Sequence, residues 1–407
     1  MRILVLDTIH GGRAIGQAFT ERGDIVDCVD VYRGESTVDV KTALTRDYDL
    51  IVAPVHLDPD HPLLIFSQAP VVSHHEAVRH LLSGDLLPEP MIEITGARGK
   101  TTTAHALAFL MPGDGILHTS TGTYRFPEKI RLSQSSITPA SLIAATRMAR
   151  EIDGWLIIEE SLGVTGAGTL AIITSDSDYF FAAGKKSALT TKIASVKHCN
   201  CLLLAKNIQA DFQGHVIHLE DVASCTDTEC CITLSGKTCS FSNPLLAVPG
   251  YHTSLVLAAA AAMILGINPE PLSSFSALPG RMSVSYEKDL LIIDNANSGS
   301  NVTSAVEAAQ YARSKTGNEP VTLVIGQEEG DGAVCEGFAF EQIQAAIDQI
   351  RPANVIWVGT HPGPKTRGYD QLVPLISAYA DTLREAYDTA LRITVKGSIV
   401  LSVKTWR

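Results

Sequence analysis

The apolar residues of this chain fall into two patterns that alternate along its length. Short, wholly apolar runs are typical of strands buried in a parallel sheet, and the longer amphipathic stretches between them are typical of helices. At the start of the chain we expect a strand from Ile3 to Asp7, a helix from Arg13 to Arg22 and a strand from Asp24 to Tyr32. Later strands are expected at Tyr48–Val55, Met91–Thr95, Trp155–Ile158, Leu290–Asp294, Val321–Ile325, Val355–Val358 and Ser398–Val403. This alternation predicts an α/β fold with parallel sheets.

The turn after the Met91–Thr95 strand carries a phosphate-binding signature. It contains Gly96, Ala97, Arg98, Gly99, Lys100, Thr101 and Thr102, and an apolar helix from Ala104 to Met111 follows. The glycines let backbone N–H groups approach phosphate oxygens, and the helix N-terminus adds partial positive charge. Lys100 can reach the outer phosphates, and the Thr101 hydroxyl can ligate Mg²⁺. The flanking strand and helix favour a nucleotide site over a chance glycine-lysine turn.

This short G-x-x-G-K-T loop, preceded by Ile94 and Thr95, resembles that of the Mur ligase superfamily, the muramyl-peptide ligases and folylpolyglutamate synthetases. The resemblance implies ATP and Mg²⁺ as cofactors. It also implies a reaction in which ATP phosphorylates a substrate carboxylate and a nucleophile attacks the acyl phosphate. Three domains are implied as well: a Rossmann-like N-terminal substrate domain (1–88), a central P-loop ATP-binding domain (89–280) and a Rossmann-like C-terminal lid (281–407).

Other positions match the superfamily in order and approximate spacing. Glu159 ends a strand where the family has a Mg²⁺-binding carboxylate, although a solvated acidic residue is the alternative. His252 matches a segment that contacts the nucleotide, although Thr253 replaces an asparagine there. Arg281 lies in the hinge before the lid, where it can bind phosphate. Asp294 ends a strand, where it can contact the ribose or a hinge group.

Three positions concern the family's metal ligands and helix termini. Thr138 is a candidate N-cap, with Pro139 at the first helical position. Tyr179 stands where the family has a metal-binding histidine, so a second Mg²⁺ is in doubt. Lys192 is a candidate for the lysine that many members carry in carbamylated form. The alternative for Lys192 is an ordinary surface lysine.

Two glycine-rich segments resemble one branch of the superfamily, the coenzyme F(430) synthetases of methanogenic archaea. The first is Asp7–Gly12, and the second, Ser161–Gly168, comes directly after the acidic pair. The resemblance implies a nickel tetrapyrrole with many carboxylates as substrate. ATP would activate one propionate, and an internal carbon nucleophile would close a six-membered carbocyclic ring with release of ADP and phosphate. Substrate contacts are then expected at His10, Gly11, Gly12, Arg125, Ser161 and Gly163.

Several alternatives stay open at this point. His10 and His252 are both candidates for the general base that deprotonates carbon, and either can be a structural histidine. The cations Arg13, Lys129, Arg131, Lys185 and Lys186 can pair with substrate carboxylates or be solvated. An amide ligase that joins an amino acid to a carboxylate is the first alternative function. A P-loop ATPase or metal-insertion partner without ligase activity is the second.

Composition narrows the partners and the compartment. The net charge is −12, from 32 Lys and Arg against 44 Asp and Glu, so nucleic acid is a poor partner. The longest apolar run, Leu255–Ile267, is shorter than the ~20 residues of a spanning helix, and the N-terminus lacks signal-peptide features, so a cytoplasmic protein is expected. Six of the eight cysteines lie between Cys199 and Cys239. We expect reduced thiols there, in preference to a disulfide framework or a metal cluster. The oligomeric state is not predicted.

Overall fold

The computed structural model describes residues 1–32, 34–84, 86–328, 338, 340–360 and 375–405. The chain divides into two compact units. One contains Met1–Ser242 and Thr253–Ser273, and the other contains Asn243–His252 and Ser274–Arg407. The three domain ranges expected from the sequence stay a prediction.

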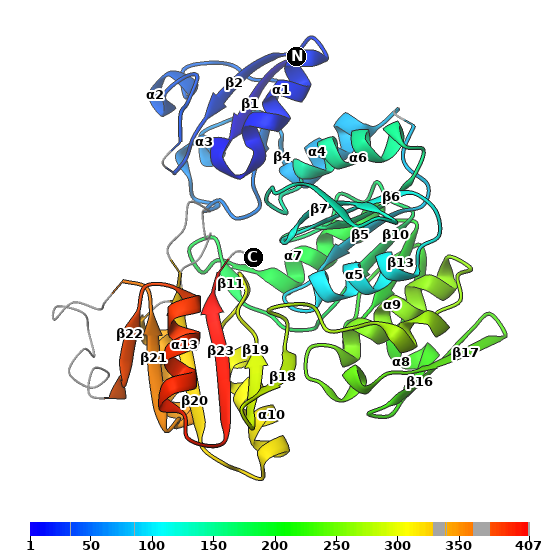
Figure 1. The fold of residues 1–407 in the computed structure, drawn as a ribbon. Coiled ribbons are helices and arrows are strands. Elements are labelled where there is room, and N and C mark those ends of the chain that lie inside the picture. The colour runs from blue at the N-terminus through cyan, green and yellow to red at the C-terminus, as the bar shows by residue number, and fades with distance from the viewer. Residues whose placement is uncertain (33, 85, 329–337, 339, 361–374, 406–407) are drawn as a thin grey trace. The chain divides into compact units, whose positions relative to one another are not determined.

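The first unit begins with a four-stranded parallel sheet in the order β2-β1-β3-β4 (Figure 1). Its strands are β1 (Arg2–Leu6), β2 (Ile25–Val29), β3 (Leu50–Ala53) and β4 (Val71–Ser73). Its helices are α1 (Arg13–Glu21), α2 (Val40–Ala43), α3 (Pro62–Ile65) and α4 (His74–Leu82), and the wide turn η1 (Thr8–Gly12) joins β1 to α1. The β1 side chains Ile3 and Val5 pack with Phe19 of α1 and Val78 of α4. This arrangement confirms the α/β opening expected from the sequence.

A larger sheet forms the rest of the first unit, in the order β14-β13-β10-β5-β9-β6-β7-β8. The strands are parallel from β14 to β6, and β7 and β8 run antiparallel at one edge. They are β5 (Met91–Thr95), β6 (Gly115–Thr119), β7 (Gly122–Phe126), β8 (Ile130–Ser133), β9 (Trp155–Glu159), β10 (Leu170–Ile173), β13 (Cys201–Leu204) and β14 (His215–His218). The sequence pattern predicted β5 and β9 and did not reveal β6, β7, β8, β13 and β14.

The helices of this region are α5 (Lys100–Leu110), α6 (Ser141–Glu151), α7 (Ala188–Ser195), α8 (Leu219–Val222) and α9 (His252–Ile264), with the short turns η2 (Val196–His198) and η4 (Glu270–Ser274). The short turn η3 (Pro244–Ala247) belongs to the second unit. The prediction that Thr138 caps α6 is wrong. The helix begins at Ser141 after Ala140, and Thr138 and Pro139 form the turn before it. Their carbonyls accept from the N–H groups of Ser141 and Leu142, so the chain tightens before the helix begins.

Two small antiparallel sheets complete the first unit. They contain β11 (Phe180–Phe181) with β12 (Lys186–Ser187), and β15 (Ala223–Cys225), β16 (Glu229–Leu234) and β17 (Lys237–Ser242). Cys225 and Cys230 are directly opposite on β15 and β16, and a disulfide joins them. The expectation of reduced thiols is therefore wrong for this pair. It holds for Cys199, Cys201, Cys231 and Cys239, which are free.

The second unit is built on a six-stranded sheet in the order β18-β19-β23-β20-β21-β22, parallel except for β18. Its strands are β18 (Ser283–Glu287), β19 (Leu290–Asp294), β20 (Val321–Gln327), β21 (Asn354–Val358), β22 (Ala378–Ala380) and β23 (Ser398–Lys404). Its helices are α10 (Val302–Thr316), α11 (Phe340–Ile350) and α13 (Leu383–Ile393). The four strands predicted for this region are all present.

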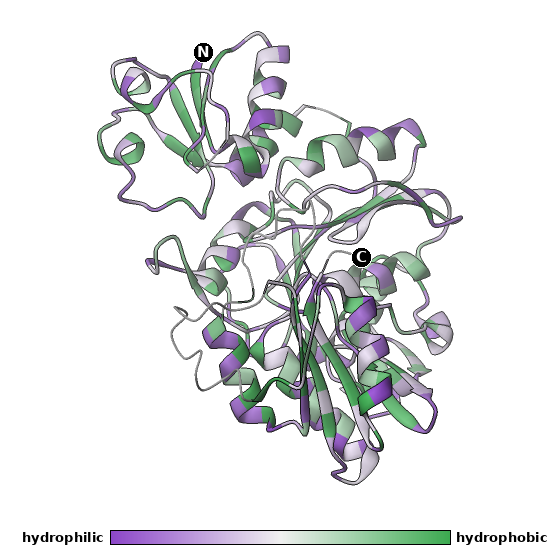
Figure 2. Ribbon diagram, turned by 60° about the vertical axis from the view of Figure 1, so that its left-hand side comes forward, coloured by the Kyte–Doolittle hydropathy of each residue, from purple (hydrophilic) through white to green (hydrophobic). Residues whose placement is uncertain are grey.

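Apolar residues are concentrated in the strands of the sheets, which are largely green in Figure 2. Every residue of β5, β9 and β23 is buried, so these strands are covered on both faces. The helix α9 is apolar around nearly its whole circumference and is buried from Ser254 to Ala262. An all-round apolar helix of this kind belongs to a protein core. Among the described residues, no helix has both the length and the apolar character needed to cross a bilayer.

Candidate active site

The P-loop connects β5 to α5 and needs glycine at two positions. Gly96 has φ 148° and Gly99 has φ 83°, a region that other residues rarely adopt. A Cβ on Gly96 would collide with the Thr174 hydroxyl, and one on Gly99 would lie 3.0 Å from Ser254 Oγ. The Lys100 ammonium lies over the loop and donates to the Gly96 carbonyl at 3.0 Å. The loop therefore has the backbone shape that the sequence motif predicts.

Glu159 ends β9, the neighbour of β5, and its carboxylate lies beside the P-loop. The side chain is almost completely buried. The Thr101 hydroxyl donates to Oε2 at 2.8 Å, and the Lys100 ammonium lies 3.7 Å from Oε1. The structure therefore brings Glu159 next to Lys100 and Thr101, although 59 positions separate Lys100 from Glu159 in the sequence. This is expected when parallel strands end at the same edge of a sheet.

Ser120 is a further member of this group that the sequence did not reveal. Its backbone N–H donates to Glu159 Oε2 at 3.1 Å, and its hydroxyl lies 3.2 Å from Thr101 Oγ1. Ser120 follows β6, which pairs with β9 on the side opposite β5. The available signal was the hydroxyl-rich run Thr119–Thr121 after a short apolar segment.

Lys192 lies in α7 and is not a surface lysine. Its side chain is 1% exposed, and its Nζ has no hydrogen-bond partner among the described residues. The ammonium lies 5.0 Å from the centre of the Tyr179 ring. Burial, reinforced by the positive charge of Lys100 and opposed by Asp178, lowers the pKa of Lys192 to about 8. The influence of Lys100 indicates that Lys192 lies near the P-loop.

Within the second unit, two predicted residues lie near the buried Tyr251. Arg281 and Asp294 are both close enough to influence the pKa of Tyr251, which burial raises to about 12. The Tyr251 hydroxyl accepts from the Leu278 N–H at 2.7 Å. Asn297 donates to the Gly280 carbonyl at 2.7 Å and so holds the turn that carries Arg281.

His252 begins α9, and its Nδ1 lies 3.0 Å from the Leu246 carbonyl.

Comparison with known proteins identifies the family. A model of the C-terminal domain of coenzyme F430 synthetase CfbE matches residues 284–405. A coenzyme F(430) synthetase from Methanosarcina acetivorans is 30% identical over 478 residues, which cover 100% of this chain and 99% of that protein. The chain belongs to the coenzyme F(430) synthetase family. A member of this synthetase family is an ATP-dependent ligase, in agreement with the P-loop. A second relative, the coenzyme F(430) synthetase of Methanocaldococcus jannaschii, is 25% identical over 228 residues, 50% of this chain and 52% of that protein.

Solved structures place the coenzyme F(430) synthetase family member among Mur ligase folds. E. coli FolC in complex with ADP has a TM-score of 0.58 at 16% identity and covers 81% of this chain and 90% of its own. MurF from Acinetobacter baumannii has a TM-score of 0.53 at 15% identity and covers 97% of this chain and 95% of its own. These similarities confirm the predicted α/β, Mur ligase-like architecture.

The glycine-rich segment Ser161–Gly168 is packed against the neighbouring structure. The Thr165 hydroxyl donates to Glu93, and the Gly166 N–H donates to the same carboxylate at 2.7 Å. Burial and the negative charge of Glu93 raise the pKa of the adjacent Glu160 well above its usual range. Ser161 is held through its carbonyl, 3.1 Å from His75 Nε2. Gly163 has φ 157°, and a Cβ there would lie 3.0 Å from the Ser195 side chain.

The other glycine-rich segment, η1, lies at the carboxyl end of β1. A Cβ on Gly11 would lie 2.7 Å from Ala140 Cβ, and one on Gly12 would collide with the Asp7 carbonyl. His10 contacts the Asp7 carboxylate, with its Nδ1 2.8 Å from Oδ2. A second histidine, His56, also reaches this carboxylate, with its Nε2 3.0 Å from Oδ2. No pattern in the sequence points to it.

Arg125 is not brought to the P-loop. It lies on β7 opposite Ile116, at the end of β6 far from Ser120, and its guanidinium is 3.8 Å from Asp114. Lys185 is already paired with Asp58 and Asp60, at 2.7 and 2.6 Å.

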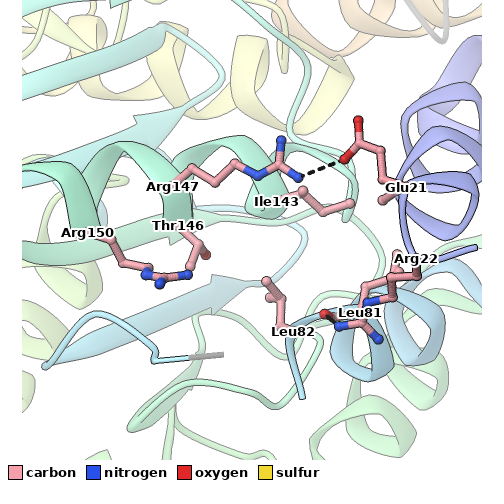
Figure 3. Close-up of a pocket in the computed structure, with 9 residues that line it drawn as sticks. Glu21, Arg22, Leu81, Leu82, Ile143, Thr146, Arg147 and Arg150 are labelled. Atoms are coloured by element: carbon pink, nitrogen blue, oxygen red, sulfur yellow. Dashed lines mark hydrogen bonds and ion pairs between the residues drawn. The ribbon is translucent and has the colours of Figure 1, made fainter. Parts of the chain in front are cut away.

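A small pocket lies elsewhere in the first unit, between α1, α4 and α6 (Figure 3). It is lined by Ala18, Glu21, Arg22, Leu81, Leu82, Ile143, Thr146, Arg147 and Arg150. Arg147 forms an ion pair with Glu21 at 3.2 Å, and Arg22 donates to the His80 carbonyl at 3.1 Å. No residue expected to act in the reaction lines it.

Proposed function

We propose that this member of the coenzyme F(430) synthetase family closes the carbocyclic ring of the nickel tetrapyrrole coenzyme F(430). ATP would phosphorylate one propionate of the polycarboxylated tetrapyrrole. An internal carbon nucleophile would then attack the acyl phosphate, form a carbon–carbon bond and release phosphate, with ADP as the second product. The observation that carries this proposal is the full-length relative named coenzyme F(430) synthetase.

The P-loop residues are proposed to bind the ATP phosphates. The backbone of Gly96 to Thr102 would surround the phosphates, and Lys100 would contact the oxygens on which negative charge develops during transfer. Support comes from the Lys100 ammonium, which lies over the loop within 3.0 Å of the Gly96 carbonyl.

Mg²⁺ is proposed to bind at Glu159 and Thr101, with Ser120 beside them. The donor set fits this ion because it consists of a carboxylate and two hydroxyls, the oxygen ligands that Mg²⁺ prefers. Bound there, Mg²⁺ would neutralise charge on the transferred phosphoryl group. Glu159 is almost completely buried, and such a carboxylate needs a positive partner.

Lys192 is proposed to be carbamylated. The reaction joins the neutral amine to CO₂ and releases a proton, so it requires an amine that is partly unprotonated. The buried Lys192, with its pKa lowered to about 8, satisfies this requirement. The product would be a carboxylate beside Lys100, whose positive charge it would offset.

In the second unit, His252, Arg281 and Asp294 are proposed to contact nucleotide during the reaction. Arg281 would bind phosphate, His252 would contact the nucleotide, and Asp294 would contact the ribose or a hinge group. Support comes from the position of Arg281 in a turn held by Asn297. His10 and His252 are the two candidates for the base that removes the proton from carbon.

The tetrapyrrole is proposed to contact the two glycine-rich segments, through His10, Gly11, Gly12, Ser161 and Gly163. Both segments follow strands at their carboxyl ends, where α/β proteins bind ligands. Arg125 lies at the opposite end of its sheet, so it is the weakest of the proposed contacts.

ADP release tests this function against its alternatives. With the seco-acid nickel tetrapyrrole, ATP and Mg²⁺, we expect ADP release that depends on the tetrapyrrole and is unchanged by added amino acids. A requirement for an amino acid would establish an amide ligase, and equal turnover without tetrapyrrole would establish an ATPase. Lys100→Ala should abolish the tetrapyrrole-dependent turnover. Lys197→Ala is the matched control, because Lys197 is an exposed lysine paired with Glu76.

A further inference from the structure

A compact cluster of metal-ligating side chains lies at the carboxyl end of the N-terminal sheet. Asp7 and His10 come from the segment after β1, and His56 comes from the segment after β3, the strand that pairs with β1. His10 Nδ1 lies 2.8 Å from Asp7 Oδ2, and His56 Nε2 lies 3.0 Å from the same oxygen. One oxygen and two imidazole nitrogens, all within 4.8 Å of one another, therefore converge on a single point.

We propose that Asp7, His10 and His56 bind a divalent transition-metal ion of the first row, such as Zn²⁺, Co²⁺ or Ni²⁺. Two imidazole nitrogens with one carboxylate oxygen form a borderline donor set, which suits these ions better than Mg²⁺. With metal–ligand bonds of ~2.1 Å, neighbouring ligand atoms lie ~3.0 Å apart at right angles and ~3.4 Å apart in a tetrahedron. The separations of 2.8 and 3.0 Å are close to these values, so small movements of the two imidazoles would admit an ion.

The charge and shape of the site also suit a cation. The Asp7 side chain is completely buried, and its carboxylate accepts from the backbone N–H groups of Ile9 and His10 and contacts the two imidazoles. A buried carboxylate is stabilised by a positive charge. The His10 and His56 side chains are 25% and 29% exposed, so an ion between them would be reachable from solvent.

The surrounding structure holds the ligands in place. Asp7 has φ 70°, an unusual conformation for a residue with a side chain, and such strain is common at functional sites. The Tyr32 ring packs against both imidazoles, with ring centres 5.5 Å from His10 and 5.7 Å from His56. Lys186 donates to the Val55 carbonyl at 2.9 Å, which fixes the backbone beside His56.

This site is separate from the proposed Mg²⁺ site, because it shares no residue with Glu159 and Thr101. Its occupation would make His10 a metal ligand, and His252 would then be the remaining candidate for the general base. The proposal does not depend on the ring-closing function, since metal binding is measured without ATP or tetrapyrrole.

The test is metal binding by the full chain, purified without a histidine tag and stripped with a chelator. Titration with Co²⁺, followed by visible absorption, should show one site per chain with imidazole coordination, and Zn²⁺ should displace the Co²⁺. We expect His56→Ala to weaken Co²⁺ binding at least ~100-fold, since it removes a ligand and even supporting residues contribute 10- to 100-fold.

His215→Ala is the matched control. His215 is exposed and lies 3.7 Å from the Cys201 sulfur, another pair of side chains that could bind a soft metal. Its removal should leave the Co²⁺ affinity unchanged. Circular dichroism verifies that each variant is folded, and His10→Ala serves as a second ligand variant. Absence of stoichiometric binding, or equal affinity in wild type and His56→Ala, would overturn the proposal and indicate a purely hydrogen-bonded cluster.

Discussion

Replacing Lys192 by methionine should remove both the carbamate and most of the activity. The methionine side chain has a similar length and no amine, so it can occupy the same buried space beside Tyr179. Lys197→Met is the control, because Lys197 lies in the turn after α7 and is exposed. Surface ion pairs such as that of Lys197 with Glu76 contribute little to the free energy of folding, so the control variant should stay folded.

The expected extent of carbamylation follows from the pKa of Lys192. Burial and the charge of Lys100 lower it from 10.5 to about 8, against the influence of Asp178. At pH 7.5 an amine with this pKa is neutral in about a quarter of the molecules, whereas an ordinary lysine is neutral in about one in a thousand. The reactive fraction is therefore raised about 200-fold. Because neutral amine increases as pH rises through 8, carbamate formation should rise over the same range.

The assay is ¹³C NMR of the protein equilibrated with ¹³C-bicarbonate, combined with tetrapyrrole-dependent ADP release. Wild type and Lys197→Met should show a carbamate resonance that Lys192→Met lacks. We expect kcat of Lys192→Met to fall by ~10²-fold, the upper range for groups that support a metal site. Full activity of Lys192→Met, or no resonance in the wild type, would refute the reasoning.

Three further substitutions test other parts of the structure. Glu159→Gln should lower kcat/KM for ATP by ~10²-fold, or ~2.7 kcal/mol, because it removes a metal-binding charge. The control Glu151→Gln, on the exposed end of α6, should leave kcat/KM unchanged. Steady-state kinetics of both variants over a titration of Mg²⁺ test this. Glu160→Gln should raise the melting temperature more at pH 8 than at pH 5. The pKa of Glu160 is raised in the folded state, so its contribution to stability is fully present at low pH and is lost as pH rises. An equal change in melting temperature at both pH values would contradict this. Tyr251→Phe should lower the free energy of unfolding by ~0.5–1.5 kcal/mol in urea, because the half-buried Leu278 N–H loses its acceptor. An unchanged midpoint would argue against this contact.

Local sequence patterns predicted the parts of the site that are contiguous in the chain. The P-loop is one segment between a strand and a helix, and its glycines are required by its own backbone angles. The strand ranges of β5 and β19 were predicted to the residue, since each is a short, largely apolar run that ends at a polar group. Glu159 was found because it ends such a run.

The remaining residues of the site depend on contacts between distant segments. Ser120 follows β6 and reaches the Glu159 carboxylate only because β6 lies next to β9. His56 becomes a candidate metal ligand only because the fold brings it next to Asp7, which is 49 positions away in the sequence. The burial of Lys192 likewise depends on packing in the folded unit, so its position in the sequence was compatible with a surface lysine.

The most direct test of the proposed reaction is the mass of its product. Purified protein is incubated with ATP, Mg²⁺ and the seco-acid nickel tetrapyrrole, and the tetrapyrrole is analysed by mass spectrometry. Ring closure predicts a product that has lost one water, formed together with one ADP per tetrapyrrole and without any amino acid. An unchanged tetrapyrrole despite ADP release, or a mass gain equal to an added amino acid, would contradict carbon–carbon ring closure.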